Sequence, residues 1–174
     1  MKRVLISTGA TFPFDALFES ILSDKVLLKL STLGVTEVLC QYGGTSTSKA
    51  KFDHLVHTIT GPVKISGFSL TDNMILEFQQ AWLVFSHAGT GTIFDVLRLP
   101  PPRPKLIVVA NPVLMNGHQS EVAQALERMH CLLYARSVSS DAIIATIDQL
   151  TTKFEDLPIR QSITAVVNFE AGVS

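Results

Sequence analysis

Short apolar runs alternate with helical patterns along most of this chain, and no other feature restricts its possible folds so strongly. The apolar runs lie at 4–7, 37–42, 63–66, 82–86, 105–110 and 131–135. Between them, apolar residues recur at the spacing of one helix face, at about 14–32, 48–57, 72–80, 92–99, 117–129 and 139–152. Strands that alternate with helices predict βαβ units and a parallel sheet. Because the runs are apolar throughout, we expect helices to cover both faces of that sheet.

The chain length fits one domain of this architecture. Its 174 residues lie within the range of about 100–200 residues that a single domain usually occupies. We expect residues 1–152 to form an α/β, Rossmann-like domain, with a parallel sheet and helices on both faces. Residues 153–174 show no clear contribution to a core, and we expect a C-terminal tail or a docking helix there.

The composition is apolar and poor in charge. Hydrophobic residues make up 47% of the chain and charged residues 17%, against about 25% charged residues in a typical globular protein. This composition excludes intrinsic disorder, which requires low hydrophobicity and high net charge. The net charge of -1 argues against a general nucleic-acid-binding protein, which would carry a basic excess. We therefore expect a partner to cover part of the apolar surface.

The sequence predicts a cytosolic protein without a membrane span. No stretch reaches the about 18 uncharged apolar residues that a spanning helix requires, and the first apolar run is too short for a signal peptide. Cys40 and Cys131 lie far apart in apolar stretches, which favours buried thiols in a reducing compartment over a disulfide. His54 and His57 are one helical turn apart but have no evident third ligand, so we expect no metal site.

Polar, glycine-containing loops follow the predicted strands. In an open parallel sheet, ligands bind outside the carboxyl ends of the strands. That rule selects the loops at 7–11, 43–46, 67–70, 86–92 and 111–119, each of which is rich in Gly, Ser, Thr, Asn or His. Several such loops at one edge of an apolar sheet predict a binding site at that edge.

The segment FSHAGTGTIFD at 85–95 is the strongest candidate within these loops. It runs from an apolar strand through two glycines into a helix, for which Thr90 or Thr92 would be the N-cap. Free N–H groups and the helix dipole at such a terminus favour a phosphate, and His87 offers a further hydrogen bond to a phosphate oxygen. The carboxylate of Asp95 could accept hydrogen bonds from paired hydroxyls such as those of ribose.

Two alternatives to a phosphate site remain open for this segment. It could be an ordinary strand-to-helix turn that contains a satisfied histidine. A dinucleotide-binding fingerprint is the second alternative, and the sequence disfavours it. Phe94 stands where the third glycine of that fingerprint belongs, and the segment follows a late strand rather than the first one.

A second segment, NPVLMNGHQSEVAQAL at 111–126, again runs from a strand into a helix. It places Asn116, His118 and Gln119 at the helix start. Neutral amide and imidazole groups, which both donate and accept hydrogen bonds, suit the hydroxyls of a sugar. The alternative is that Asn116 or Gly117 merely starts the helix. The N-terminal glycine loop offers hydroxyls and backbone N–H groups of the same kind as the first segment.

With both segments in view, the sequence resembles the donor-binding half of the GT-B glycosyltransferases. It is similar to the asparagine-linked glycosylation protein thirteen family, the catalytic subunit that adds the second N-acetylglucosamine to dolichol-pyrophosphate-linked N-acetylglucosamine. The resemblance runs from VLISTGATFPFDAL to about residue 152 and is most specific at the SHAG and HQ segments. It implies that the chain is the carboxyl half of a GT-B enzyme. The other half would be a separate, membrane-anchored subunit that recruits the chain to the cytosolic face of the endoplasmic reticulum.

The resemblance also implies roles for individual residues. Two glycine-containing segments would meet the donor diphosphate: His87, Gly89, Thr90, Gly91 and Thr92, together with Thr8, Gly9 and Ala10. The residues that would face the donor sugar are Asn116, His118 and Gln119. The ribose would bind at Asp95, and the uracil region would include Phe68 and Ser69. The resemblance implies neither a metal nor a cofactor.

The sequence departs from the family pattern at three places. Ala10 and Thr11 follow the first glycine, where the family commonly has Thr-Thr or Thr-Ser. Asp95 is one methylene shorter than the usual Glu, and the proline-rich residues 100–104 resemble an insertion. These departures concern the fine geometry of donor binding rather than the class of protein.

The implied reaction is an inverting transfer from UDP-N-acetylglucosamine, in which the acceptor 4-hydroxyl attacks the anomeric carbon and UDP leaves. No Asp-x-Asp cluster for a metal occurs in the chain, which agrees with this implication. The sequence does not identify a general base, which could come from the partner subunit. A non-catalytic module that binds a nucleotide sugar on the same fold shares every phosphate feature and stays open. A Rossmann oxidoreductase fragment would instead bind NAD.

Overall fold

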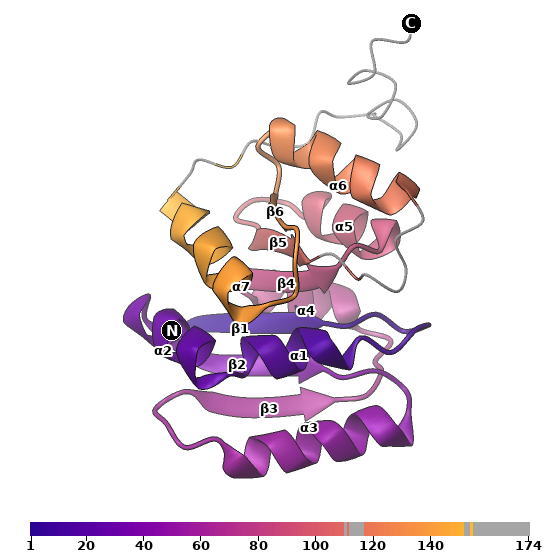
Figure 1. The fold of residues 1–174 in the computed structure, drawn as a ribbon. Helices are drawn as coiled ribbons and strands as arrows, with labels where there is room; N and C mark the ends of the chain where they lie inside the picture. The colour runs from indigo at the N-terminus through magenta and orange to yellow at the C-terminus, as the bar shows by residue number, and fades with distance from the viewer. Residues whose placement is uncertain (110, 112–116, 152–153, 155–174) are drawn as a thin grey trace, which may run out of the picture.

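The computed structural model describes residues 1–109, 111, 117–151 and 154. The strands are β1 (Lys2–Ser7), β2 (Val35–Gln41), β3 (Lys64–Phe68), β4 (Leu83–His87), β5 (Lys105–Val109) and β6 (Leu133–Ala135). The helices are α1 (Asp15–Ile21), α2 (Asp24–Thr32), α3 (Ser46–Thr58), α4 (Met74–Gln80), α5 (Thr90–Leu97), α6 (Gly117–Arg128) and α7 (Ser140–Ile147), and the 3-10 turn η1 (Asp148–Thr151) follows α7. Strands and helices alternate as the apolar pattern predicts (Figure 1).

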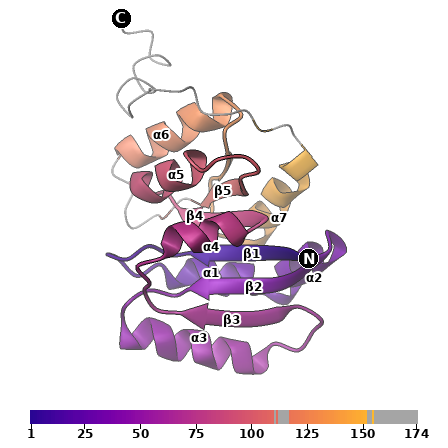
Figure 2. The same cartoon turned by 180° about the vertical axis from the view of Figure 1, so that it is seen from behind.

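The strands form one parallel sheet in the order β3-β2-β1-β4-β5-β6. Figures 1 and 2 show this sheet from its two sides. The order reverses direction between β1 and β4, as it does in a Rossmann fold. The predicted α/β class, a Rossmann-like parallel sheet with helices, is therefore confirmed.

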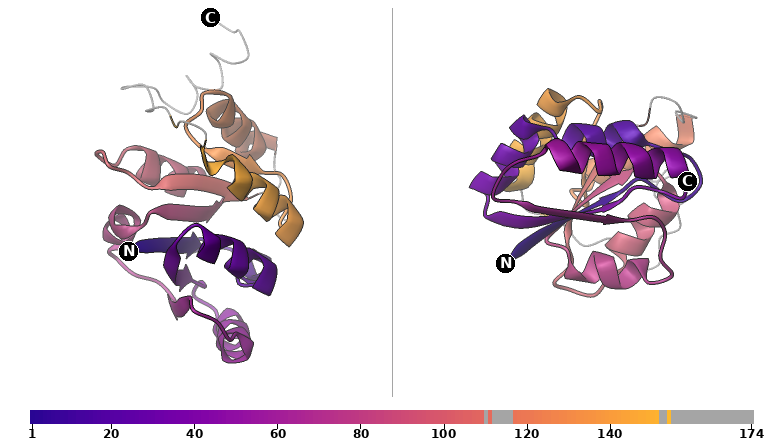
Figure 3. Two further views of the ribbon diagram at one scale, coloured as in Figure 1. Left: turned by 90° about the vertical axis from the view of Figure 1, so that its left-hand side faces the viewer. Right: turned by 90° about the horizontal axis from the view of Figure 1, so that it is seen from below.

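Helices cover both faces of the sheet (Figure 3). Successive side chains of a strand point to opposite faces, so Val4 and Ile6 of β1 pack in one cluster of apolar side chains and Leu5 packs in another. The first cluster includes side chains of α1, α2, α3 and α7, and the second includes side chains of α4, α5 and α6. Both faces of the strands are thus buried, which explains why the runs are apolar throughout.

The helix expected at about 14–32 is divided into α1 and α2. Ser23, the N-cap of α2, has an extended backbone with φ -66° and ψ 149°. Its hydroxyl donates a hydrogen bond to the carbonyl of Ser20 at 2.7 Å. A serine side chain that bonds to the nearby backbone in this way competes with helix propagation. The apolar spacing continues across the break, which is why the sequence predicts one helix.

Three further expectations concern buried thiols, membrane spans and metal ligands. Cys40 and Cys131 are both buried, as predicted, and burial raises the pKa of the Cys40 thiol, so Cys40 is a packing residue. Among the described residues, no helix is both long enough and apolar enough to cross a membrane. In the same part of the chain, His54 and His57 are exposed on α3, and no three potential metal-ligating side chains gather.

Candidate functional site

The strand order places the loops after β1 and β4 next to each other. Ser7 of β1 pairs with Ser86 of β4 at the carboxyl edge of the sheet. From this edge the chain continues from β1 to α1 on one face, and from β4 to α5 on the other face. The point where successive connections diverge is where open α/β sheets bind ligands. The fold therefore brings together the loops at 7–11 and 86–92.

His87, the last residue of β4, is half-buried and adjoins both glycine loops. A Cβ atom at Gly9 would lie 2.6 Å from Cε1 of His87, and a Cβ atom at Gly89 would lie 2.1 Å from its Nε2. Real atoms do not approach so closely, so the ring keeps its place only while both positions are glycine. Gly9 also has a φ of 86°, which L residues rarely adopt. One imidazole ring thus joins two segments that the sequence predicts separately.

The surroundings of His87 favour its neutral form. Burial lowers the pKa of the imidazole below its ordinary value of 6.5, and the backbone of Ser7 opposes this effect only in part. The Nδ1 atom is buried and has no hydrogen-bond partner among the described residues. An unpaired buried polar atom is costly, and it marks either local strain or a site that a bound group completes.

The helix α5 begins at Thr90, directly after this loop, and Gly89 is its N-cap. The prediction that Thr90 or Thr92 caps this helix is wrong, because the helix begins two residues before the expected position and both threonines lie in its first turn. No described side chain caps α5, whereas Thr45 caps α3 and Ser139 caps α7. The first N–H groups of α5 are therefore available to an anion at the positive end of the helix dipole.

A buried hydrogen-bond network holds the loop that follows β1. The hydroxyl of Ser7 donates to Oε1 of Gln41 at 2.8 Å, and the hydroxyl of Thr8 donates to the backbone carbonyl of Gln41 at 2.9 Å. The backbone N–H of Thr8 donates to the same carbonyl at 3.3 Å. Both donors of Thr8 are thus directed to β2. In this structure Thr8 fixes the position of Gly9, and a diphosphate contact of Thr8 stays a prediction.

Gln41 is the residue of this site that sequence reasoning missed. It ends β2 and is buried, although an amide at such a position requires a partner. A polar side chain at the carboxyl end of the apolar run at 37–42 was the available signal. Gly43, with a φ of 94°, follows in the next loop, where an added Cβ atom would lie 3.6 Å from the hydroxyl oxygen of Thr8. Gln41 and Gly43 therefore belong to the support of the first glycine loop.

The residues predicted for the nucleoside are divided between two elements, α5 and the end of β3. Asp95 is exposed on α5. Phe68 is the last residue of β3 and is half-buried, and Ser69 follows it on the surface. Three strand spacings separate β3 from β4, so this region lies about 14 Å from His87 along the sheet. A nucleotide would have to extend along the carboxyl edge to contact both regions, and these two roles stay predictions.

The residues predicted to face the sugar are placed at the start of α6. This helix begins at Gly117, as expected, and His118 and Gln119 lie in its first turn. Asn116 and the side chains of His118 and Gln119 lie outside the described residues. The preceding strand β5 neighbours β4, so α5 and α6 follow adjacent strands at the same edge of the sheet. The sugar-binding roles of the three residues stay predictions.

A separate groove of about 330 Å³ lies at the opposite, amino edge of the sheet. It is bordered by α2 and by the segment that leads into β3, with Leu27, Leu28, Ile59 and Pro62 in its lining. The groove is mainly apolar and contains none of the glycine loops. It is therefore not part of the candidate site.

The lowered pKa of His87 predicts a pH dependence of folding stability. Because the unfolded chain titrates near 6.5 and the folded chain below it, the unfolded state binds more protons between those two pKa values. The free energy of unfolding should therefore fall as the pH falls through this window. Denaturant titrations at several values between about pH 7.5 and about pH 5 measure this free energy. It should decrease less for His87→Gln than for the natural chain as the pH falls. The matched control is His54→Gln, which removes an exposed imidazole, and equal slopes for the natural chain and His87→Gln would contradict the prediction.

Sequence comparison relates the chain to a family of transferases. Residues 3–171 match the family described as the glycosyltransferase family 28 C-terminal domain. The UDP-N-acetylglucosamine transferase subunit ALG13 of Yarrowia lipolytica is 38% identical over 156 residues, which are 89% of this chain and 76% of that protein. The subunit of the same name from Saccharomyces cerevisiae is 28% identical over 187 residues, covering 91% of this chain and 89% of that protein.

Structural comparison gives the same relationship. A solution structure of ALG13 determined by NMR superposes with a TM-score of 0.72 and 26% identity, covering 99% of this chain and 94% of the other. The crystal structure of MurG from Acinetobacter baumannii superposes with a TM-score of 0.67 and 18% identity. That match covers 86% of this chain but only 41% of the MurG chain, and at this identity it shows a shared fold.

Proposed function

This chain belongs to the glycosyltransferase family 28 C-terminal domains and to the ALG13 group of UDP-N-acetylglucosamine transferase subunits, and from this premise we propose its reaction. It is a glycosyltransferase. We propose that it transfers N-acetylglucosamine from UDP-N-acetylglucosamine to dolichol-pyrophosphate-linked N-acetylglucosamine, the second step in the assembly of the lipid-linked oligosaccharide for N-glycosylation. The new linkage is β-1,4 and forms with inversion.

The active enzyme that we propose is a heterodimer with a membrane-anchored subunit. The relatives are each named as a subunit, which supports a second chain. In this proposal the partner recruits the chain from the cytosol to the cytosolic face of the endoplasmic reticulum. In this proposal residues 1–152 form the donor-binding domain, and residues 153–174, nearly all of which lie outside the described residues, are a C-terminal tail or a docking helix.

The observation that carries the proposal is the convergence of His87, Gly9 and Gly89 at the start of α5. Departure of UDP places growing negative charge on the diphosphate. The free N–H groups of the first turn of α5 and the positive end of its dipole would stabilise that charge. A neutral His87 would donate one hydrogen bond to an oxygen atom of the diphosphate. In this proposal these groups stabilise the leaving diphosphate without a metal ion.

The remaining roles in this proposal are those that the resemblance to the family implies. The diphosphate lies against Gly89, Thr90, Gly91 and Thr92, and against Thr8, Gly9 and Ala10 in the neighbouring loop. In this proposal the ribose binds at Asp95 on α5, and the uracil binds at Phe68 and Ser69 after β3. The donor sugar binds at Asn116, His118 and Gln119 at α6. The proposal assigns no general base to this chain, and the partner subunit could supply one.

A transfer assay tests this function. The chain is co-expressed with the membrane-anchored subunit of the Yarrowia lipolytica transferase, and radiolabelled UDP-N-acetylglucosamine is added with a lipid-linked N-acetylglucosamine acceptor. We expect a disaccharide product that requires both chains and that forms in the presence of EDTA. Binding of UDP without transfer would identify a non-catalytic module, and binding of NAD in place of UDP would identify an oxidoreductase fragment. Either result would contradict the proposal.

A further inference from the structure

Four loops at the carboxyl edge of the sheet are almost free of charge. They follow β1, β2, β3 and β4, at 8–14, 42–45, 69–73 and 88–89, and Asp72 is the only charged residue in these ranges. Charged residues make up 17% of the whole chain, so these loops carry less charge than even this charge-poor chain does on average. The core of a protein interface is typically depleted of charged residues. The low charge of these loops is therefore consistent with an interface.

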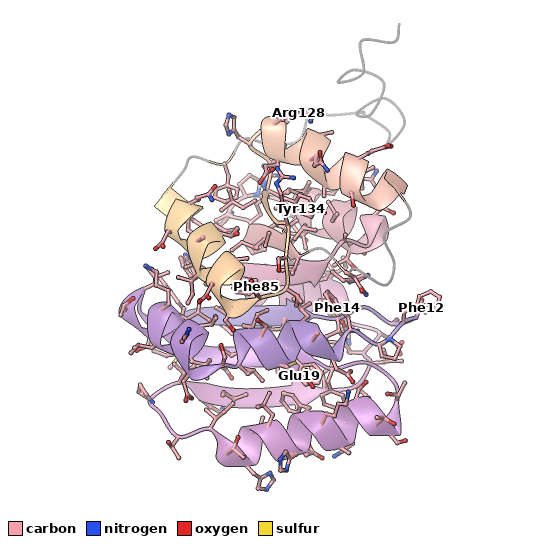
Figure 4. All side chains as sticks on the ribbon, viewed as in Figure 1. Phe12, Phe14, Glu19, Phe85, Arg128 and Tyr134 are labelled. Atoms are coloured by element: carbon pink, nitrogen blue, oxygen red, sulfur yellow. The ribbon has the colours of Figure 1, made fainter. Side chains whose placement is uncertain are left out.

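Large apolar side chains are exposed along the same edge. Phe12 is 58% exposed in the loop after β1, and Leu70 is 51% exposed in the loop after β3. Ile75 and Leu76, in the first turn of α4, are 44% and 49% exposed. Figure 4 shows Phe12 extended away from the body of the molecule at the end of this loop. We call these four residues the apolar rim. Single exposed apolar residues are ordinary, but four at one edge suggest a covered surface.

Close contacts join these loops into one continuous surface. A Cβ atom at Gly9 would touch His87, which links the loops after β1 and β4. A Cβ atom at Gly43 would lie 3.9 Å from the carbonyl of Gly9, and one at Gly44 would lie 3.3 Å from Cδ1 of Leu70. The loops after β1, β2 and β3 are therefore in contact as well. Leu70 of the apolar rim is thereby connected to the candidate donor site, so a protein that covers Leu70 also lies next to that site.

We propose that the apolar rim is the surface on which the second subunit docks over the donor site. This inference rests on the proposed function, which requires a second protein chain to bring the acceptor to the bound donor. A subunit seated on the rim would enclose the diphosphate region and exclude water from it. The rim thus couples assembly of the complex to completion of the active site.

The charge pattern favours a protein over a lipid surface as the occupant. Segments that bind membranes containing anionic lipids use clusters of Lys and Arg. The four loops contain no Lys or Arg, and Asp72 would be repelled by an anionic surface. An apolar, uncharged rim with an exposed phenylalanine instead fits the core of a protein interface, which is depleted of charge and enriched in aromatic residues.

The test compares the double variant Phe12→Ser/Leu70→Ser with Leu28→Ser. Leu28 is 68% exposed on α2 at the opposite edge, so it controls for the loss of an exposed leucine. Each chain is titrated against the membrane-anchored subunit of the Yarrowia lipolytica transferase, purified in detergent and immobilised. Loss of two anchors should raise the Kd of the complex about tenfold or more, and Leu28→Ser should stay within about twofold of the natural chain. Matching thermal unfolding curves show that all three chains are folded.

Three outcomes would overturn this inference: no binding of the subunit by the natural chain, unchanged binding by the double variant, or an equal loss for Leu28→Ser. A fourth is that the natural chain binds vesicles of phosphatidylcholine and phosphatidylinositol without the subunit and the double variant does not. The transfer assay is read separately. A complex that forms through the rim but does not transfer sugar refutes the proposed reaction, while an active complex insensitive to the rim variants refutes only the docking surface.

Discussion

Replacing Gly9 by alanine is expected to lower the free energy of unfolding by about 2–4 kcal/mol, because two separate costs add. The first is backbone strain, since Gly9 has a φ of 86°. The second is a steric conflict, since the new Cβ atom would lie 2.6 Å from Cε1 of His87. The buried network of Ser7, Thr8 and Gln41 anchors the loop, so the backbone cannot shift freely to relieve the conflict. Chemical denaturation followed by circular dichroism measures the loss.

Gly34 offers a matched control for the first cost. Its φ is 81°, and nothing lies within 4 Å of an added Cβ atom, so Gly34→Ala should lose only about 1–2 kcal/mol from backbone strain. Gly89 offers the converse control. Its φ of -69° suits any residue, but a Cβ atom there would lie 2.1 Å from Nε2 of His87. Gly89→Ala therefore measures the steric conflict together with a small change in N-cap preference.

Removal of the ring should rescue both clashing variants. In a His87→Ala background, Gly9→Ala should cost about as much as Gly34→Ala, and Gly89→Ala should cost no more than the loss of a glycine N-cap, about 1 kcal/mol. If Gly9→Ala costs the same with and without the ring, His87 does not constrain this loop. The packing of the two glycine loops on one imidazole would then be refuted.

The sequence predicted the architecture because both faces of the sheet are buried. A strand such as β1, whose side chains pack in separate clusters on opposite faces, must be apolar at every position. The division of the helix at about 14–32 was not predictable from that pattern. It depends on the backbone conformation of Ser23 and its bond to Ser20, and the apolar periodicity carries no information on either.

The position of the candidate site followed from the rule that ligands bind beyond the carboxyl ends of parallel strands. That rule selected the loops containing Gly9 and Gly89, but it could not show that both meet the ring of His87. Contacts between segments that are about 80 residues apart depend on the strand order, which a single sequence does not encode locally. Gln41 was missed for the same reason, because its partners lie elsewhere in the chain, Ser7 at the end of β1 and Thr8 in the loop that follows.

Replacing His87 by alanine is expected to lower the rate of sugar transfer by about 10²-fold or more in the proposed complex with a membrane-anchored subunit. Loss of one preorganised donor to a developing oxyanion typically costs about 10²–10³-fold in kcat. Burial keeps His87 neutral near neutral pH, so the imidazole is suited to donate a hydrogen bond without an ion of its own. His87→Gln, which retains an N–H donor at a similar reach, should recover part of the rate.

The separation of kcat from donor affinity decides whether His87 acts on the leaving diphosphate. If His87 stabilises the growing charge, its loss lowers kcat more than it weakens UDP binding. If His87 only supports the loop, its loss lowers both, and the glutamine variant is as impaired as the alanine variant. Transfer kinetics and UDP calorimetry on the same preparations provide both numbers, and thermal unfolding confirms that each variant is folded. Near-natural turnover by His87→Ala would refute its role toward the diphosphate, and near-natural turnover by Gln119→Ala would likewise refute the sugar assignment. If only the histidine variants fail, the charge on the departing UDP is stabilised at the start of α5, while recognition of the sugar depends on groups other than Gln119.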